Sequence, residues 1–427
     1  MKFVSTRNPG DTATFREAVL KGMAPGGGLW MPETLPVFED WDSLLQLRWV
    51  ERGEIILRRF IGDEFDQDAF AAAIHSALDF PIPLAQVRRG LHVLELFHGP
   101  TLAFKDVGAR FFAHILELIR EPGRPLTILT ATSGDTGAAV AQAFWQLPGA
   151  RVVVLYPKGG VSDLQERQFA TLGDNVAALA VEGSFDDCQA LVKACFNDAE
   201  LSARHGLTSA NSINVARLLP QMLYYAEAVA QLHKQDVRDG IVFAVPSGNF
   251  GNLCAGLMAQ RTGLPLRAFV AATNANATVP RYLDSGDYCP RPSVATLSNA
   301  MDVGAPNNWE RIQHLFGGNF HALRQALRWG FKDDADTRRS IRELTGMGYL
   351  ADPHAAVAYG VLEERLGLSE TGVFLGTAHP AKFLPVYESM GIPVPIPDSL
   401  EALRNRPLLS KEILNDVVAV RQALENP

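Results

Sequence analysis

The sequence predicts an α/β protein of two or three domains. Its 427 residues exceed the size at which a single hydrophobic core usually stops growing. Beyond residue 83, short apolar segments of strand length alternate with amphipathic segments of helix length, which is typical of βαβ units. The strand segments are continuously apolar rather than alternating. We therefore expect parallel sheets that are covered by helices on both faces.

The first 82 residues have the composition of a separate unit. Helices are expected at 14–21 and 41–47, with a loop rich in glycine and proline at 24–32. The segment Phe80-Pro-Ile-Pro83 is expected to be a linker, because two prolines prevent a helix from running through it. We expect a small N-terminal α+β unit over residues 1–82 and a larger region over residues 83–427.

The first half of the larger region is expected to contain three strands and three helices in alternation. Ser184 is a typical helix N-cap because acidic residues occupy the turn that follows it. The expected strands are 126–130, 151–156 and 176–181, and the expected helices are 137–146, 161–172 and 184–197.

The second half has a weaker pattern. A long helix is expected at 214–233, and its apolar stripe is interpreted as a core face. Residues 275–320 are rich in Asn, Pro and Gly, and long irregular stretches of this kind are often functional. A charged helix around 333–344 is expected to face solvent. Further strands are expected at 241–245, 266–271 and 373–376.

The composition excludes several classes of protein. A net charge of -8, without basic clusters interleaved with aromatic residues, argues against a nucleic-acid partner. No apolar run approaches the length of a membrane span, and the N-terminus lacks the apolar core of a secretory signal, so we expect a cytoplasmic location. The four cysteines and ten histidines show no metal-ligand spacing, and no metal site is expected.

A single lysine dominates the segment from His98 to Arg110. Lys105 follows an apolar Leu-Ala-Phe run and stands at the start of an expected helix. Partial burial would disfavour its charged form and free the amine for imine chemistry. A solvated lysine at a helix start would have the same flanks, so this segment by itself leaves both interpretations open.

Two glycine-rich loops favour the reactive lysine. The loop Val245-Pro-Ser-Gly-Asn-Phe-Gly-Asn252 lies between a strand and a helix, where backbone amides and the helix dipole favour a bound phosphate. The loop Thr130-Ala-Thr-Ser-Gly-Asp-Thr-Gly137 is rich in hydroxyl groups and suits a carboxylate. Asp135 would repel an anion there, so it is interpreted as an acceptor for a cofactor hydroxyl. Either loop alone could be an ordinary strand-to-helix turn.

A third group lies at the end of the strand expected at 373–376. Thr377 carries a neutral hydroxyl that could hydrogen-bond a heteroaromatic nitrogen, and His379 and Lys382 follow it. Pyridoxal 5'-phosphate would use all three features, since it has an aldehyde for a lysine, a phosphate for a glycine-rich helix start and a pyridine nitrogen. The sequence therefore predicts this cofactor.

The motifs, taken in order, resemble those of the threonine synthase family, pyridoxal-phosphate enzymes of the tryptophan-synthase-β (fold-type II) group. The resemblance spans nearly the whole chain, and the N-terminal unit distinguishes it from dehydratases and cysteine synthases. Two departures are Asp135, where relatives outside the family usually carry Asn, and Trp30, where the family often has Tyr. The motifs are Ser5-Thr-Arg, Gly28–Glu33, the Lys105 segment, Ser133–Gly137, Ser184–Cys188, Ser209–Asn214, Pro246–Gly251 and Gly376–Pro380.

The resemblance implies two doubly wound α/β domains of the fold-type II kind beside the N-terminal unit. A smaller subdomain at about 107–215 would be inserted in a larger domain at about 83–106 and 216–427. Lys105 would be the catalytic residue that carries the cofactor. The other implied cofactor ligands are Ser247, Gly248, Asn249, Phe250, Gly251 and Asn252 for the phosphate, Thr377 for the ring nitrogen, and Asp135. The implied substrate ligands are Ser133, Gly134 and Thr136 for the carboxylate, with Asn211, Asn214, Lys382 and Arg7 as candidates for the substrate phosphate.

The reaction implied by the resemblance converts O-phospho-L-homoserine and water to L-threonine and phosphate. Its only expected partner is this small-molecule substrate, and both a monomer and a homodimer are compatible with the sequence. A serine or threonine dehydratase would share Lys105 and both loops but act by β-elimination. A noncatalytic relative with the same fold, and a lyase that works without cofactor, are the remaining alternatives.

Overall fold

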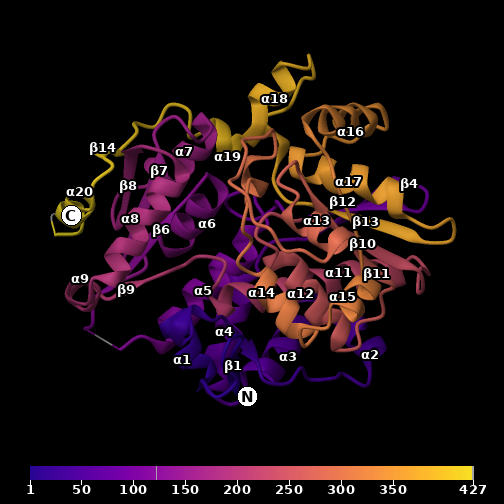
Figure 1. Ribbon diagram of the computed structural model, residues 1–427, viewed down its shortest axis with the longest axis horizontal. Helices are drawn as coiled ribbons and strands as arrows, with labels where there is room; N and C mark the ends of the chain where they lie inside the picture. Colours follow the sequence, from indigo (N-terminus) through magenta and orange to yellow (C-terminus); the bar gives the residue numbers. More distant parts are fainter. Residues whose placement is uncertain (122, 426–427) are drawn as a thin grey trace.

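The computed structural model describes residues 1–121 and 123–425, which form an N-terminal unit and two sheets flanked by helices. In Figure 1 the N-terminal unit lies at the bottom in indigo, with the smaller sheet on the left and the larger sheet on the right. The chain crosses from one sheet to the other along α5 (Lys105–Ile119) and returns through the segment before α10 (Val215–Leu218).

The N-terminal unit contains a small antiparallel sheet and four helices. The helices predicted at 14–21 and 41–47 are confirmed, whereas α3 and α4 were not predicted. Thr14 starts the first helix with a reciprocal capping box, in which its hydroxyl accepts the amide proton of Glu17. The elements are β1 (Phe3–Ser5), β2 (Thr12–Ala13), α1 (Phe15–Lys21), a 3-10 turn (Pro25–Gly27), β3 (Trp30–Pro32), α2 (Trp41–Gln46), α3 (Trp49–Ile61) and α4 (Gln67–Ala77).

The larger sheet has helices on both faces, as predicted from its continuously apolar strands. Phe243 and Val245 of its central strand belong to the core formed with α11 and α12, while Val242 and Ala244 pack in the cluster that includes α17. Only β4 runs antiparallel to its neighbour. The strands in spatial order are β12 (Leu327–Phe331), β11 (Ala268–Thr273), β10 (Ile241–Pro246), β13 (Thr371–Gly376), β5 (Leu91–Glu95) and β4 (Leu84–Arg88).

The smaller sheet is parallel throughout and also buried on both faces. Its strands in spatial order are β14 (Lys411–Leu414), β8 (Val176–Glu182), β7 (Ala150–Pro157), β6 (Leu126–Ala131) and β9 (Leu207–Thr208). Its helices are α5, α6 (Asp135–Phe144), α7 (Asp163–Ala170), α8 (Phe185–Asn197), α9 (Ala199–His205) and α20 (Val417–Glu425). The three strands and three helices predicted between 126 and 197 are confirmed.

The C-terminal segment departs from the predicted division of the chain. The sequence analysis assigned all of 216–427 to the larger domain, but β14 pairs with β8 of the smaller sheet and α20 packs on α8. In Figure 1 this yellow segment crosses the top of the molecule to the far left. Residues 411–425 therefore belong to the smaller sheet. The prediction was wrong there because strand pairing across more than 200 residues leaves no local signal.

The helix predicted at 214–233 is in fact two helices, α10 and α11 (Gln221–His233). Pro220 lies at the break, where its missing N–H and its ring prevent a continuous hydrogen-bond ladder.

The other helices are α12 (Gly251–Arg261), α13 (Thr278–Ser285), α14 (Trp309–Leu315), α15 (Phe320–Ala326), α16 (Asp334–Gly346), α17 (Pro353–Arg365), α18 (Leu384–Glu388) and α19 (Asp398–Glu401), with 3-10 turns at Asn299–Met301 and Pro380–Phe383.

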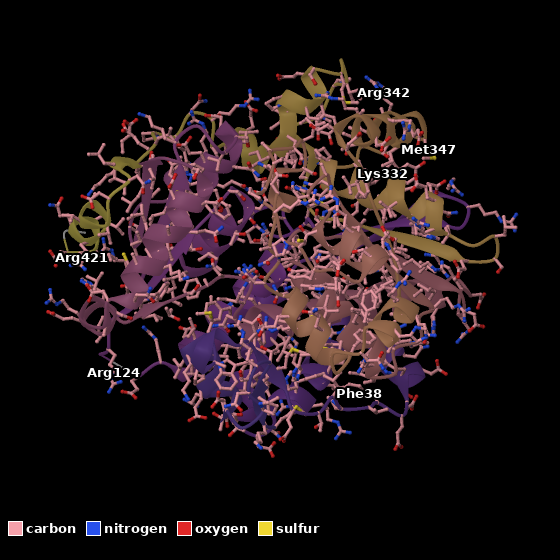
Figure 2. The ribbon with its side chains drawn as sticks, in the orientation of Figure 1. Phe38, Arg124, Lys332, Arg342, Met347 and Arg421 are labelled. Carbon is pink, nitrogen blue, oxygen red and sulfur yellow. The ribbon has the colours of Figure 1, made fainter. Side chains whose placement is uncertain are left out.

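One charged helix lies at the surface, as its sequence predicts. The charged helix predicted around 333–344 is α16, and Figure 2 shows Arg342 at its outer edge, pointing away from the core. Within the described residues, no helix is both long enough and apolar enough to cross a membrane. The same part of the chain holds no group of three His, Cys, Asp or Glu side chains suited to a metal ion.

The N-terminal unit is attached to the rest of the protein by buried polar contacts as well as by apolar packing. The Trp41 indole donates to the Thr262 carbonyl at 3.0 Å, and Arg52 of α3 forms an ion pair of 2.6 Å with Glu227 of α11. The Asn214 side-chain amide donates to the Val19 carbonyl at 2.9 Å. These contacts connect the unit to α11, to the end of α12 and to the start of α10.

We expect Arg52→Ala to destabilise the protein by about 3–5 kcal/mol, because it leaves the Glu227 carboxylate buried without its partner. Arg48→Ala is the matched control, since it removes an exposed arginine from an ion pair within the same helix start. The control should cost much less, because solvent screens this exposed pair. Urea denaturation of both variants measures the difference, and equal costs would contradict a structural role for the buried pair.

Candidate active site

Lys105 is the first residue of α5, and its position is set by hydrogen bonds to the segment after β13. The Phe104 amide donates to the Thr377 carbonyl at 2.8 Å, and the His379 amide donates to the Leu102 carbonyl at 3.0 Å. Ala103 and Ala378 form an antiparallel bridge between these bonds. Two motifs that are 272 residues apart in sequence are thereby joined, and Lys105 lies beside Thr377.

The Lys105 amine has an environment that favours its neutral form. Its side chain is partly accessible, as a ligand would require. Its pKa is lowered to about 8, mainly by desolvation, with Asp135 opposing the shift and the charges of Arg217 and Lys382 adding to it. A substantial fraction of the amine is therefore unprotonated near neutral pH and able to form an imine.

The turn before Lys105 is held by Asp106. Its carboxylate accepts the Thr101 amide at 2.8 Å and the Thr101 hydroxyl at 2.6 Å. Gly99 lies so close to this carboxylate that a Cβ at that position would be 2.5 Å from Asp106 Oδ2. Burial raises the pKa of Asp106, with the hydrogen bonds from Thr101 opposing the shift. The turn is therefore fixed by contacts within the His98–Arg110 segment itself.

The loop after β6 is shaped by Thr132, whose hydroxyl oxygen accepts the Gly134 amide at 2.9 Å and the Gly137 amide at 2.7 Å. Gly134 has a φ of 133° and packs against Gln165, so a larger residue would be strained and crowded. Ser133 and Thr136 are partly exposed. The loop thus presents both hydroxyl-bearing side chains at the N-terminus of α6, as a carboxylate site requires.

Asp135 forms a buried ion pair of 2.6 Å with Lys382, and both side chains are at most 3% exposed. Gln165 Nε2 donates to the same carboxylate at 3.0 Å. Burial alone would raise the pKa of Asp135, but the charges of Lys382 and Lys105 hold it well below its usual range. The sequence analysis treated Asp135 and Lys382 as separate ligands, whereas the structure brings them together. The contact between Asp135 and a cofactor hydroxyl stays a prediction.

The second glycine-rich loop ends at α12. Phe250 caps this helix with a left-handed φ of 60°, and a Cβ on Gly248 would lie 2.7 Å from Met301 Cα. Asn249 and Asn252 stabilise the loop itself, because Asn249 Nδ2 donates to Ser212 Oγ at 2.7 Å and Asn252 Nδ2 donates to the Pro246 carbonyl at 2.8 Å. Their side chains therefore shape the loop.

The backbone of this loop fits a phosphate group. Among the described residues, the amide N–H groups from Gly248 to Asn252 donate to no protein acceptor. Such amides at a helix N-terminus are the usual ligands of a cofactor phosphate. We call the backbone of 248–252 the phosphate loop. The loop follows β10, which pairs in parallel with β13, so it lies at the same edge of the sheet as Thr377 and Lys105. Together, Lys105 and the loop meet two of the three requirements of pyridoxal phosphate.

Thr377 is held by Asp352, which the sequence analysis did not identify. The Thr377 amide donates to Asp352 Oδ2 at 3.1 Å, and its hydroxyl lies 3.3 Å from Asp352 Oδ1. Asp352 also caps α17 and contacts His354 Nδ1 at 2.8 Å. The Asp-Pro pair is a visible helix-start signal, but a cap is all that it predicts. Thr377 stays predicted as the partner of the ring nitrogen.

Two of the candidate ligands of the substrate phosphate, Asn214 and Arg7, have their polar groups bound within the protein. The Asn214 side chain is completely buried, and it donates to the Val19 carbonyl at 2.9 Å while accepting the Ala216 amide at 3.0 Å. Arg7 is exposed and binds the Glu310 carboxylate through two nitrogens, with a third on the Gly26 carbonyl. Both residues join the N-terminal unit to its neighbours, and their polar groups are occupied by these contacts.

Arg217 is a site residue that the sequence analysis missed. It lies within the segment predicted as a long helix, 214–233, outside the apolar stripe interpreted as core, and it is 4% exposed. Its charge acts on Lys105, and burial lowers its own pKa to about 10 while Asp106 opposes the shift.

Asn211, the remaining phosphate candidate, is partly buried and accepts a hydrogen bond of 3.0 Å from the Thr130 hydroxyl. Its contact with substrate stays a prediction.

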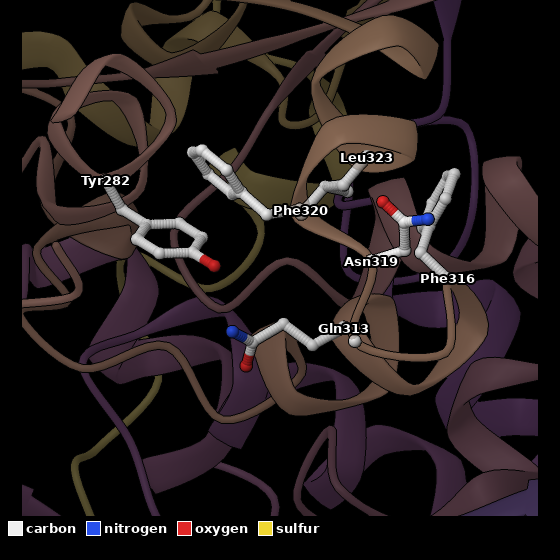
Figure 3. Close-up of a pocket in the computed structure, with 7 residues that line it drawn as sticks. Tyr282, Gln313, Phe316, Asn319, Phe320 and Leu323 are labelled. Carbon is white, nitrogen blue, oxygen red and sulfur yellow. The ribbon is translucent and has the colours of Figure 1, made fainter. Parts of the chain in front are cut away.

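A small pocket elsewhere in the larger domain includes none of these residues. It lies between α13, α14 and α15, and Figure 3 shows the rings of Tyr282 and Phe320 on one side of it. Its lining is formed by Tyr282, Gln313, Phe316, Gly318, Asn319, Phe320 and Leu323. This largely aromatic pocket lacks a charged group and is separate from the Lys105 site.

We expect capture of pyridoxal phosphate by the cofactor-free protein to rise with pH and to be half-maximal near pH 8. The reason is that only the unprotonated Lys105 amine attacks the aldehyde, and its pKa is about 8. Borohydride reduction at a series of pH values, followed by mass spectrometry, measures the captured fraction. Lys105→Ala is the control and should capture none, and a midpoint near the ordinary lysine value of about 10.4 would contradict the lowered pKa.

Comparison with known families covers both parts of the chain. Residues 81–375 match the family model described as pyridoxal-phosphate dependent enzyme. Residues 2–78 match the model described as threonine synthase N terminus. The cofactor predicted from Lys105 and the two loops is therefore confirmed at the level of the family.

Curated relatives and solved structures agree over the full length. The chain is 51% identical to threonine synthase of Haemophilus influenzae, covering 99% of each chain, and 49% identical to that of Escherichia coli, covering 100% of each. The crystal structure of the Escherichia coli enzyme superposes with a TM-score of 0.94 and covers 100% of both chains. A pyridoxal-phosphate-bound threonine synthase from Brucella melitensis, 36% identical, gives a TM-score of 0.92 and covers 99% of this chain and 98% of that one. The site around Lys105 and the match over both parts of the chain place this protein in the threonine synthase family of pyridoxal-phosphate-dependent enzymes.

Proposed function

We propose that the protein converts O-phospho-L-homoserine and water to L-threonine and phosphate. Membership of the threonine synthase family supports this reaction. The observation that carries it is the Lys105 amine, whose pKa of about 8 is set by burial next to two further cations, Arg217 and Lys382. A substrate with both a phosphate and a carboxylate suits a site with this charge.

The cofactor, when bound, supplies an electron sink for negative charge at the substrate carbons. Lys105 would hold its aldehyde carbon until the substrate amine displaces it, the phosphate loop would hold its phosphate, and Thr377 would contact its ring nitrogen. Asp352 orients Thr377 through both its amide and its hydroxyl. The contact between the Thr377 hydroxyl and Asp352 Oδ1 is long at 3.3 Å, so the hydroxyl would turn to donate its proton to the ring nitrogen, which is an acceptor.

Lys105 is also suited to move protons once it is free. A base with a pKa near the working pH can accept a proton and return it. The reaction needs transfers at the α and β carbons, and the residue that held the cofactor is already beside them. The Asp135–Lys382 ion pair stabilises the protonated Lys105 less than a lone Asp135 would, because Lys382 offsets the carboxylate.

The substrate anions have separate groups available. The loop from Ser133 to Thr136 at the N-terminus of α6 is proposed to bind the carboxylate. Arg217 is proposed to bind the phosphate, because its cation is buried near Lys105 and its Nε has no hydrogen-bond partner among the described residues. Lys382, whose ammonium binds Asp135 and the Thr101 carbonyl, is proposed to contribute charge rather than direct contact.

The decisive experiment supplies purified protein with O-phospho-L-homoserine and measures phosphate and threonine. The wild type should release both in equal amounts, and Lys105→Ala should lower the rate by at least about a thousandfold, because it removes both the covalent attachment and the proton carrier. Lys193→Ala, at an exposed lysine of α8, is the matched control and should retain full activity. Release of 2-oxobutanoate from threonine, without phosphate release from phosphohomoserine, would identify a dehydratase instead.

Arg217→Gln should raise the KM for O-phospho-L-homoserine by about 10- to 100-fold, the usual cost of losing a hydrogen bond to a charged group. Arg7→Ala is the control, because its guanidinium is engaged by Glu310 and Gly26 and should leave the KM unchanged. Steady-state kinetics with phosphate detection separates the two. A larger effect from Arg7→Ala would refute the assignment of Arg217.

A further inference from the structure

We propose that Asn308 is a further ligand of the cofactor phosphate and that Arg311 orients its amide toward the phosphate loop. The proposal rests on the assignment of the phosphate loop above. It adds to the backbone amides a side-chain donor from the irregular region 275–320, to which the sequence analysis assigned no residue.

Asn308 lies directly against the phosphate loop. It precedes α14, its side chain is completely buried, and its backbone amide donates to the Asn249 carbonyl at 3.3 Å. The Asn307 amide donates to Asn249 Oδ1 at 2.6 Å. A Cβ on Gly251 would lie 3.4 Å from Asn308 Nδ2. The side-chain amide of Asn308 therefore faces the first turn of α12, where the unpaired backbone amides are.

Asn308 Nδ2 is a buried donor without a hydrogen-bond partner among the described residues. A buried donor without a partner destabilises a protein, so such groups are rarely left without a ligand. The five adjacent backbone N–H groups also lack protein acceptors. An anion with several acceptor oxygens satisfies all of them together, and phosphate is such an anion.

The orientation of the Asn308 amide is determined by Arg311. Arg311 Nη1 lies 2.6 Å from Asn308 Oδ1. A guanidinium group can only donate hydrogen bonds, so the atom that faces it must be the amide oxygen. The NH₂ group of Asn308 then points to the phosphate loop. Arg311 acts through Asn308 and is a positioning residue.

Arg311 is held in place by carbonyl groups rather than by a carboxylate. Its Nε and Nη2 donate to the Trp30 carbonyl at 3.2 and 3.1 Å, and Nη2 also donates to the Ile213 carbonyl at 2.6 Å. The neighbouring Glu310 carboxylate binds Arg7 instead. A completely buried cation needs a compensating charge, and a phosphate on the far side of Asn308 provides one.

The Trp30 carbonyl belongs to β3 of the N-terminal unit. The unit is therefore connected to the cofactor phosphate through Trp30, Arg311 and Asn308, in that order. The departure at Trp30 from the tyrosine common in the family leaves this path intact, because the path uses the backbone carbonyl and not the side chain.

The test compares pyridoxal phosphate with pyridoxal, which lacks the phosphate but forms the same bond to Lys105. Affinities are measured by absorbance titration of the cofactor-stripped full-length protein. Asn308→Ala removes the donor, and Asn308→Asp keeps the size and the acceptor for Arg311 while placing a negative charge against the phosphate. Asn307→Ala is the matched control, since this neighbouring side chain is exposed. Arg311→Lys tests the positioning role.

We expect both Asn308 variants to weaken pyridoxal phosphate binding by about 10- to 100-fold, as for loss of a hydrogen bond to a charged group. Asn308→Asp should have the larger effect. Pyridoxal binding should change by less than about twofold, because it involves no phosphate contact. Arg311→Lys should also lower the preference for the phosphorylated cofactor, and Asn307→Ala should leave it unchanged.

Three results would overturn the proposal, and Gly248→Ala tells the first two apart. If the Asn308 variants keep the wild-type preference for pyridoxal phosphate while Gly248→Ala loses it, the phosphate loop is correct and Asn308 is not a ligand. If neither Asn308 nor Gly248 variants alter the preference, the phosphate loop itself is wrongly assigned. Equal loss of pyridoxal and pyridoxal phosphate binding in Asn308→Asp would also overturn it, since that pattern reports a general disturbance of the site.

Discussion

The site depends on one lysine amine, Lys105, whose desolvation by the surrounding protein keeps it weakly basic. Burial lowers the pKa of Lys105 to about 8, and the neighbouring cations Arg217 and Lys382 act in the same direction. Asp135 acts in the opposite direction, but its charge is offset by Lys382 at 2.6 Å. This arrangement gives the amine two uses, as an attachment point that reacts near neutral pH and as a base that can return its proton.

The fold builds this environment by bringing several helix N-termini to one place. Lys105 begins α5, Asp135 begins α6, Gly251 begins α12, and Asp352, the cap of α17, holds Thr377. The positive ends of these helix dipoles favour bound anions. Both the cofactor and the proposed substrate are anions, so helix N-termini suit both ligands. The buried cations Arg217 and Lys382 add full positive charges to the partial charges of the helix dipoles.

The N-terminal unit contributes to this site without entering it. Asn214 and Arg311 bond to carbonyls of Val19 and Trp30, and Arg52 forms a buried ion pair with Glu227. These contacts reach α10, α14 and α11, which surround the phosphate loop or lead into Arg217. Removing the unit would therefore leave buried charges and polar groups of α10, α11 and α14 without their partners.

The sequence by itself determined the features that have local causes. Apolar runs predicted the buried parallel strands, glycines between a strand and a helix predicted the two loops, and the two loops together with Lys105 predicted a reactive amine. Only the tertiary structure decided which distant residues complete the site. Arg217, Asp352 and the proposed ligand Asn308 look like ordinary helix, cap and loop residues in the sequence, because the site residues that they approach, Lys105, Thr377 and Asn249, are 25 to 112 positions away. For the same reason the sequence did not show that Asn214 binds the Val19 carbonyl or that Arg7 binds Glu310, and β14 was assigned to the wrong sheet. A buried polar group is defined by its partner, and that partner is chosen by the fold.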